Sequence, residues 1–260
     1  MKKIGLGILL ACFSLVAGAQ DFSLYEKKLF VRGKDTMPYR MLFPENYNPK
    51  KSYPIVFFLH GAGERGSDNE TQLVHGSKLF LLDSIRKKYP AIVVFPQCSP
   101  QSFWSNVKFK SDPVTKKRSF EFTAGGEPTV AMSMLMDLTK GLIKHYTVKK
   151  KQVYVMGLSM GGMGAFEIAG RMPGLYAAAV PICGGGSPLT AKALKKTGWW
   201  VFHGGKDDVV SPAYSDSMVA GLKAVGAEVK YTLYPDANHN SWDAAFAEPG
   251  LLHWLFSNKK

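Results

Sequence analysis

The hydrophobic pattern of the chain consists of short, nearly continuous apolar runs separated by amphipathic stretches. Such runs predict strands buried on both faces, because helices cover both sides of a parallel sheet. Six of them follow one another, at 53–61, 90–98, 152–157, 176–183, 199–205 and 229–235. Two earlier segments, 28–33 and 39–44, alternate between apolar and polar residues, which predicts half-exposed edge strands.

The stretches between the runs have helical periodicity. They predict helices at about 72–88, 129–145, 161–171, 213–225 and 241–257. Alternating strands and helices indicate an α/β fold with right-handed crossovers. We therefore expect a mostly parallel, twisted sheet of about eight strands with helices on both faces. Ligands bind beyond the carboxyl ends of such strands, so the residues directly after each run are the candidates for chemistry.

The first nineteen residues predict a secretory signal peptide. Lys2 and Lys3 precede an apolar stretch at 4–16, and small residues at 17–19 form the cleavage site. The apolar stretch is short for a membrane-spanning helix. Lipid attachment at Cys12 is the less favoured alternative, because the residues after it stay apolar. We expect a secreted or periplasmic protein without stable membrane insertion, whose residues 20–260 form a single domain.

The chain is strongly basic, with a formal charge of +13, or +11 when Lys2 and Lys3 are removed. An excess of positive charge attracts anionic surfaces and substrates. The lysines occur as pairs and triplets in expected turns, and no recognition helix, zinc knuckle or stacking sheet accompanies them. Nucleic acid is therefore not an expected partner, and solvated turns are the simpler interpretation.

The segment QVYVMGLSMGGMGAF, residues 152–166, places Ser159 between Gly157 and Gly161. A G-x-S-x-G sequence between a strand and a helix is typical of the nucleophile elbow of the α/β-hydrolase fold. There, a strained turn projects the serine oxygen above the sheet edge, and the glycines avoid clashes across the turn. The pattern alone is weak in a chain with 26 glycines. Its position between an apolar run and a helical stretch makes Ser159 the candidate nucleophile.

A serine hydroxyl needs a base to become a nucleophile. In this fold the chain order is serine, then aspartate or glutamate, then histidine. Asp207 and Asp208 follow the run at 199–205, and His239 follows the run at 229–235. We expect His239 to accept the proton of Ser159 and one aspartate to hold the imidazole. The order alone leaves the choice of aspartate open.

The oxyanion of such a reaction requires preorganised backbone donors. The N–H of Met160, directly after the serine, is one candidate, and Ala62, in the loop after the first buried run, is the other. We interpret His60 and His203, each before a glycine at a strand end, as structural residues with hydrogen-bonded ring nitrogens. No HExxH or CxxC motif occurs, so we expect no metal and no organic cofactor.

Cys98 and Cys183 are the cysteines outside the predicted signal peptide. They follow the second and fourth buried runs. In the usual strand order of this fold, three strand steps separate those runs, about 14 Å at about 4.8 Å per step. A disulfide tolerates a Cα separation of about 7 Å at most. We expect both thiols to be unpaired and largely buried.

Six segments in order carry a family resemblance: LHGAGERGSDN, FPQCSPQSFW, GLSMGGMGAF, PICGGG, VFHGGKDDVV and NHNSWDAAF. They resemble secreted bacterial α/β-hydrolases often labelled predicted peptidases, and are similar to phospholipase/carboxylesterase and dienelactone-hydrolase-like proteins, over nearly all of residues 20–260. The resemblance implies Asp207 as the acid, Ala62 as the second oxyanion donor, and esterase activity. It also implies acetyl or hydroxycinnamoyl esters of plant cell-wall polysaccharides as substrates.

The segment 99–128 is long, rich in aromatic and basic residues, and without clear secondary structure in its pattern. Trp104 in this segment and Trp242, three residues after His239, are the candidate substrate-binding residues. Their rings suit sugars and phenolic acyl groups, and packing of the loop onto the domain is the alternative. We expect a small ester or an acylated polysaccharide as the substrate partner. Three other hypotheses about the function stay open: a serine peptidase, a lipase or phospholipase-type carboxylesterase, and a non-catalytic binding protein.

Overall fold

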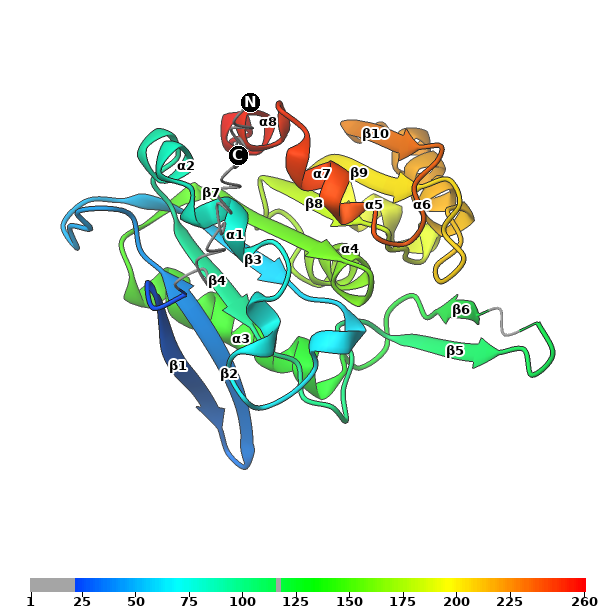
Figure 1. Ribbon diagram of the computed structural model, residues 1–260, viewed down its shortest axis with the longest axis horizontal. Coiled ribbons are helices and arrows are strands. Elements are labelled where there is room, and N and C mark those ends of the chain that lie inside the picture. Colours follow the sequence, from blue (N-terminus) through cyan, green and yellow to red (C-terminus); the bar gives the residue numbers. More distant parts are fainter. Residues whose placement is uncertain (1–21, 116–117) are drawn as a thin grey trace, which may run out of the picture.

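The centre of the protein is an eight-stranded sheet, seen in a computed structural model that describes residues 22–115 and 118–260 (Figure 1). The predicted signal peptide, residues 1–19, lies outside the described residues. The strand order is β1-β2-β4-β3-β7-β8-β9-β10. These strands are β1 Tyr25–Arg32, β2 Asp35–Leu42, β3 Tyr53–Leu59, β4 Ile92–Pro96, β7 Val148–Leu158, β8 Ala178–Ile182, β9 Gly198–Gly204 and β10 Val229–Tyr234.

The sheet is mostly parallel, as the apolar runs predicted. Strands β3, β4 and β7 to β10 run parallel, whereas β1 and β2 pair antiparallel and β2 joins β4 antiparallel. The prediction that 39–44 is an edge strand is wrong, because β2 lies between β1 and β4. Arg40 made the segment look amphipathic. Its side chain is buried, donating a hydrogen bond to the carbonyl oxygen of Tyr25 and pairing with Glu70.

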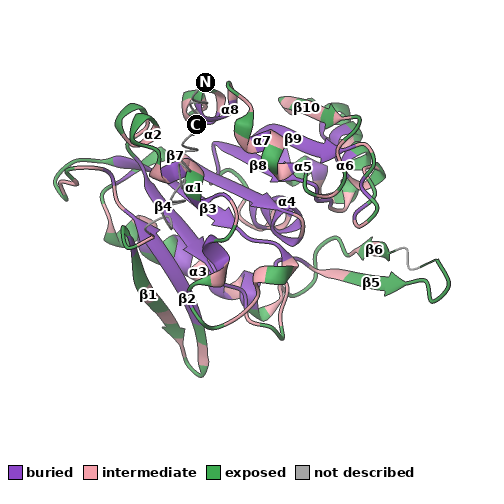
Figure 2. Ribbon diagram, in the orientation of Figure 1, coloured by how far each residue is buried: buried purple, intermediate pink, exposed green. Residues whose placement is uncertain are grey.

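Helices cover both faces of the sheet, and Figure 2 shows the buried strands between them. Successive strand residues alternate between two cores: Phe57 belongs to one and Phe58 to the other. Helices α3 to α6 close the first core, and α1, α2, α7 and α8 close the second. The helices are α1 Ser77–Leu81, α2 Asp83–Lys88, α3 Val130–His145, α4 Met160–Arg171, α5 Ala191–Leu194, α6 Ala213–Ala224, α7 Trp242–Ala247 and α8 Leu251–Ser257, with 3-10 turns η1 Ala62–Glu64, η2 Thr71–Leu73 and η3 Pro188–Thr190.

Three segments differ from the predicted elements. The helix expected over 72–88 is broken, because Gly76 has a positive φ of 78° and the chain is extended at Leu82. The helix expected over 241–257 is split into α7 and α8. The segment 99–128 contains an antiparallel hairpin of β5 Val107–Ser111 and β6 Arg118–Phe122, so the expectation of no clear secondary structure is wrong. This hairpin projects from the body of the domain (Figure 1).

The two thiols behave as the strand order predicts. Cys98 and Cys183 are both free and buried. They follow β4 and β8, which are separated in the sheet by β3 and β7. In the part of the chain that the structure describes, no helix has both the length and the apolar character needed to cross a membrane.

Candidate active site

Ser159 lies at the sharp turn between β7 and α4. Its backbone has a positive φ of 55° with ψ of −118°, a conformation that non-glycine residues rarely adopt. The backbone at Ser159 is therefore strained. A hydrogen bond from its N–H to the carbonyl oxygen of Ile182 (2.8 Å) ties the turn to β8. A Cβ on Gly161 would overlap the carbonyl oxygen of Leu59. Glycine is therefore required there for the turn to pack against β3.

The structure brings together the three side chains of the predicted triad, each from the end of a different strand. His239 Nε2 is 3.0 Å from Ser159 Oγ, and His239 Nδ1 is 2.8 Å from Asp207 Oδ2. Asp208 is exposed, and the described contact it makes is a backbone N–H donated to Asn238 Oδ1. The geometry thus selects Asp207, the aspartate that the resemblance implied.

The carboxylate of Asp207 is buried and well supplied with donors. Its Oδ1 accepts the N–H groups of Val209 and Val210, both at 2.9 Å. Its Oδ2 lies 3.1 Å from His203 Nε2 in addition to the contact with His239. Burial acts to raise the pKa of Asp207, but the hydrogen bonds from His203, His239 and Val210 outweigh it and hold that pKa well below its usual range. Asp207 is therefore ionised at neutral pH.

His203 is hydrogen-bonded at both ring nitrogens, as the sequence interpretation expected, but one of its contacts was not foreseen. Its Nε2 faces two acceptors, the carbonyl oxygen of Val210 (2.8 Å) and the carboxylate of Asp207. The proton therefore lies on Nε2, and Nδ1 faces the hydroxyl of Ser215 at 2.7 Å. The carboxylate of Asp207 therefore contacts two imidazoles, those of His203 and His239. A histidine four positions before an aspartate at a strand end was the sequence signal for this contact.

Asn238 is a second residue that the sequence reasoning missed. Its Oδ1 accepts the N–H of Asp208 (3.2 Å) and the N–H of His239 (2.7 Å). One side chain therefore links the loop that carries the acid to the loop that carries the base. Nothing in the local pattern marks it, because it precedes His239 in an ordinary polar turn.

The two expected oxyanion donors each lie at the start of a helical turn. Ala62 is the first residue of η1 and Met160 the first residue of α4, and the first N–H groups of a helix lack intrahelical partners. Both residues line the same hollow as Ser159. His60 holds the first of these loops: its Nδ1 lies 2.6 Å from the carbonyl oxygen of Gly61, and its Nε2 accepts the N–H of Cys98 at 3.0 Å. Burial lowers the pKa of His60 to about 4, so the ring is neutral.

The two candidate substrate-binding tryptophans differ in where they lie. Trp104 is fully buried, with its ring edge-on to His60 at 5.4 Å, and a Cβ on Gly164 would overlap it. The prediction that Trp104 contacts substrate is wrong, because its side chain is enclosed between Gly164 of α4 and His60. Trp242 is half-buried and edge-on to His239 at 5.4 Å, so it supports the imidazole; its contact with a substrate stays a prediction.

A hollow of ≈ 390 Å³ lies directly beside Ser159. The rings of Phe103, Phe109 and Phe120 line it, together with the guanidinium groups of Arg65 and Arg118. No carboxylate is among its lining residues. The hollow therefore combines apolar walls with positive charge next to the nucleophile.

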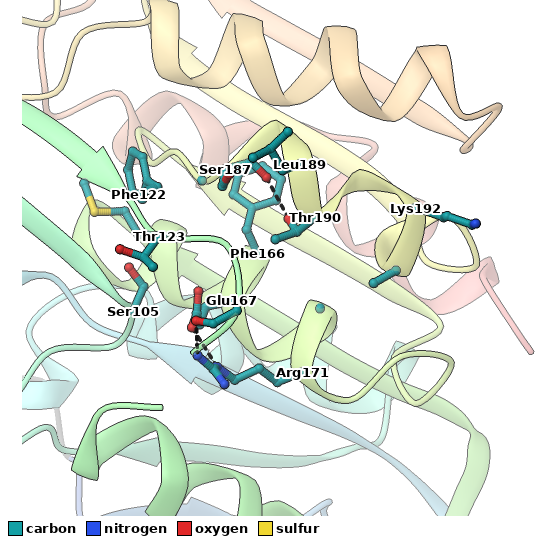
Figure 3. A pocket seen from close by; sticks show the side chains of 15 residues that line it. Ser105, Phe122, Thr123, Phe166, Glu167, Arg171, Ser187, Leu189, Thr190 and Lys192 are labelled. Carbon is teal, nitrogen blue, oxygen red and sulfur yellow. Dashed lines mark hydrogen bonds and ion pairs between the residues drawn. The ribbon is translucent and has the colours of Figure 1, made fainter. Parts of the chain in front are cut away.

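A second hollow of ≈ 470 Å³ lies between α4, η3 and the base of the hairpin (Figure 3). Met163 lines both hollows, which makes them neighbours. The second hollow contains an ion pair of Glu167 and Arg171 and none of the three triad side chains. Of these two hollows, the smaller one is the one that Ser159 lines.

Cys183, Asp207 and His239 form the one group in the described part of the chain whose ligand atoms, all within 4.8 Å of one another, could in principle hold a metal ion. Both ring nitrogens of His239 are already used by Asp207 and Ser159. Burial raises the pKa of the Cys183 thiol far above its usual range, and a neutral thiol is a poor ligand. The donors of this cluster therefore suit proton transfer better than metal binding.

Comparison with known proteins agrees with this geometry. Residues 32–217, well over half of the chain, match the family described as "Putative esterase". The structure is similar to that of a thermostable esterase, with 31% sequence identity and a TM-score of 0.81, over 92% of this chain and 64% of that one. The chain thus spans a little under two thirds of that esterase. A search of curated proteins found no match.

Two more distant structures show the same fold. One is a ferulic acid esterase from Anaeromyces mucronatus in complex with ferulic acid, with 16% identity and a TM-score of 0.63 over 90% of each chain. The other is an acylaminoacyl peptidase, with 14% identity and a TM-score of 0.60 over 91% of this chain and 42% of that one. The family match and these structures confirm the resemblance that the sequence motifs carried. The chain belongs to the esterase family and has the α/β-hydrolase fold.

Proposed function

We propose that this protein is a serine esterase that hydrolyses carboxylic esters through an acyl-enzyme. His239 Nε2 takes the proton of Ser159 as Oγ forms a bond to the ester carbonyl carbon. The N–H groups of Ala62 and Met160 stabilise the negative charge on the carbonyl oxygen. The bond from carbon to the alcohol oxygen then breaks, and His239 returns the proton to the departing alcohol.

The second half of the reaction releases the acid. A water molecule gives a proton to His239 as its oxygen attacks the acyl carbon, and Ser159 leaves with the proton that His239 returns. Asp207 stays ionised throughout and stabilises the positively charged imidazole formed in each half. Its low pKa and its buried hydrogen bonds support this role.

The observation that carries the proposal is the chain of contacts from Ser159 through His239 to Asp207, at 3.0 and 2.8 Å, beside a hollow that opens onto the serine. Ser159→Ala should remain folded and lose ester hydrolysis by several orders of magnitude, because triad members act as a unit. It should also lose labelling by a fluorophosphonate probe. Ser217→Ala, which removes an exposed serine on α6, is the matched control and should keep both. Substantial turnover by Ser159→Ala would remove this serine from the mechanism.

We further propose short acyl or hydroxycinnamoyl esters of plant cell-wall polysaccharides as the substrates. The aromatic walls of the hollow beside Ser159 support this, since flat apolar rings suit phenolic acyl groups. A panel of nitrophenyl esters of increasing acyl length, with methyl ferulate, acetylated xylan and acylaminoacyl amides, tests it. A strong preference for long acyl chains would indicate a lipase, and hydrolysis of the amides would indicate a peptidase.

We also propose that the protein is exported, with residues 1–19 removed and residues 20–260 forming the single mature domain. The charged, apolar and small-residue order of the first nineteen residues supports this. Intact mass of the protein recovered from outside the cytoplasm should correspond to a chain that begins at Gln20. A lipid adduct at Cys12 would show attachment to a membrane instead.

A further inference from the structure

The register of the β5–β6 hairpin decides which of its side chains face the active site. Phe109 pairs with Phe120 and Ser111 with Arg118, so these four residues share one face of the two-stranded ribbon. All four line the hollow beside Ser159. Lys108 and Lys110 alternate with them and belong to the opposite face. One basic residue of the described hairpin, Arg118, is therefore turned toward the nucleophile.

The base of this hairpin is held in place. The N–H of Phe120 donates a hydrogen bond to the hydroxyl of Tyr214 on α6 (2.8 Å), and the rings of Phe120 and Phe122 pack edge-on against the Tyr214 ring at 5.7 and 5.6 Å. The ring centroid of Phe109 also lies 6.3 Å from that of Phe103, which lines the same hollow. The inner face of the hairpin is thus a fixed wall of the site.

The arginines of the chain divide into two groups by their partners. Four of the six arginines form ion pairs with carboxylates: Arg32, Arg40, Arg86 and Arg171. Within residues 22–115 and 118–260, neither of the other two, Arg65 and Arg118, has an ion pair with a carboxylate. Arg65 donates to the carbonyl oxygens of Ala62, Pro100 and Ser102, which leaves its charge without a counter-ion. These are the two arginines that line the hollow beside Ser159.

In the described part of the chain, two guanidinium groups without a carboxylate partner thus line the same hollow as three apolar rings. Guanidinium binds carboxylate with two parallel hydrogen bonds, and the rings bind an aromatic face. We propose that the preferred substrates are esters in which an aromatic ring next to the scissile bond carries a carboxylate, and that Arg118 selects them. This inference rests on the proposed esterase function and names the substrate class of that site.

Matched aryl esters test the proposal and locate the charge. In 4-acetoxybenzoate the carboxylate is on the alcohol side of the ester, and in its neutral counterpart 4-acetoxybenzamide a carbamoyl group replaces it. In the anion of monomethyl terephthalate the carboxylate is on the acyl side, and in methyl 4-carbamoylbenzoate a carbamoyl group replaces it. Preference is the ratio of kcat/KM for the anionic ester to kcat/KM for its neutral partner. In at least one pair the wild-type protein should prefer the anion, and the preference should shrink at 0.5 M NaCl because salt screens exposed charges.

Variants of equal charge change separate Arg118 from the general positive charge of the protein. Arg118 is exposed, so Arg118→Gln should reduce the preference about fivefold, the upper end for an exposed ion pair. Arg118→Glu should reduce it about 20-fold, because it replaces the attraction by a repulsion of similar size. Lys110→Gln and Lys110→Glu, on the opposite face of the same hairpin, should change it less than twofold. Fluorophosphonate labelling of Ser159 in each variant verifies an intact site.

Two kinds of result would overturn the proposal, and they are distinguishable. Equal hydrolysis of both members of each pair, or equal effects of the Arg118 and Lys110 variants, would reject the anionic substrate class and leave the esterase function standing. Failure of the wild-type protein to hydrolyse any of the four esters, together with failure of Ser159 to label, would reject the esterase function and this inference with it.

Discussion

The folded chain should be destabilised by mild acid through one histidine, His60. Its side chain is buried, with 1% of the residue exposed, and burial lowers its pKa from 6.5 to about 4. Between these two values the unfolded chain binds a proton that the folded chain does not. Stability therefore rises with pH over this window and falls as the pH drops through it. From pH 7 to pH 5 the loss from this group amounts to about 2 kcal/mol.

Equilibrium unfolding in urea, followed by tryptophan fluorescence at pH 7, 6 and 5, measures this loss. His60→Gln removes the titrating group and leaves an amide that can still accept the N–H of Cys98. The free energy of unfolding of the wild-type protein should fall by about 2 kcal/mol more than that of His60→Gln between pH 7 and pH 5. Each protein is compared with itself at the two pH values, so any constant cost of the substitution cancels.

His253→Gln on α8 provides the matched control, because His253 is exposed in the folded chain as it is in the unfolded one. This variant should keep the pH dependence of the wild-type protein. If His60→Gln loses stability as steeply as the wild-type protein between pH 7 and pH 5, a neutral buried His60 is not the source of the acid sensitivity. The hydrogen bond from the N–H of Cys98 to His60 Nε2 would then need revision too, because a protonated ring has no free lone pair to accept it.

Two further predictions concern residues around the site. Asp207→Asn should reduce kcat/KM for nitrophenyl acetate far more than Asp208→Asn, because only Asp207 contacts His239; a more impaired Asp208 variant would reverse the assignment. Trp104→Ala should lower the free energy of unfolding by about 3–5 kcal/mol, as for a large buried ring. It should not change the ratio of activity on glycan-linked esters to activity on nitrophenyl acetate, and a selective loss on the glycan ester would show that Trp104 contacts substrate after all.

Much of the triad was predictable because the chemistry of this fold follows its topology. Parallel strands present their carboxyl ends at one edge, so side chains far apart in sequence, such as Ser159 and His239, meet whatever the helices between them do. Asp207 and Asp208 were not separable by chain order, since adjacent residues after a strand point in different directions. The choice depends on the turn that buries Asp207 against Val209 and Val210.

The predictions that were wrong concern side chains whose direction is set by tertiary packing. Arg40 gives β2 an alternating pattern, and its ion pair with Glu70 is formed by residues thirty positions apart. Trp104 follows a buried strand, as a substrate-binding residue would, but the direction of the chain after Cys98 turns its ring inward. The orientation of Arg118 depends on the register of a hairpin, and a shift of one residue would turn Lys110 toward Ser159 instead.

The positive charge beside Ser159 has a consequence for every ester, because the tetrahedral intermediate is itself an anion. An arginine near the oxyanion would accelerate neutral and anionic substrates alike, and loss of that effect would lower kcat/KM for both. A contact with a carboxylate on the substrate would instead act on the anionic member of each pair alone. The ratio of the two rates cancels the first effect and retains the second. A fall in kcat/KM without a change in this ratio in Arg118→Gln would therefore make Arg118 a stabiliser of the intermediate, whereas a fall in the ratio makes it a residue that selects the substrate.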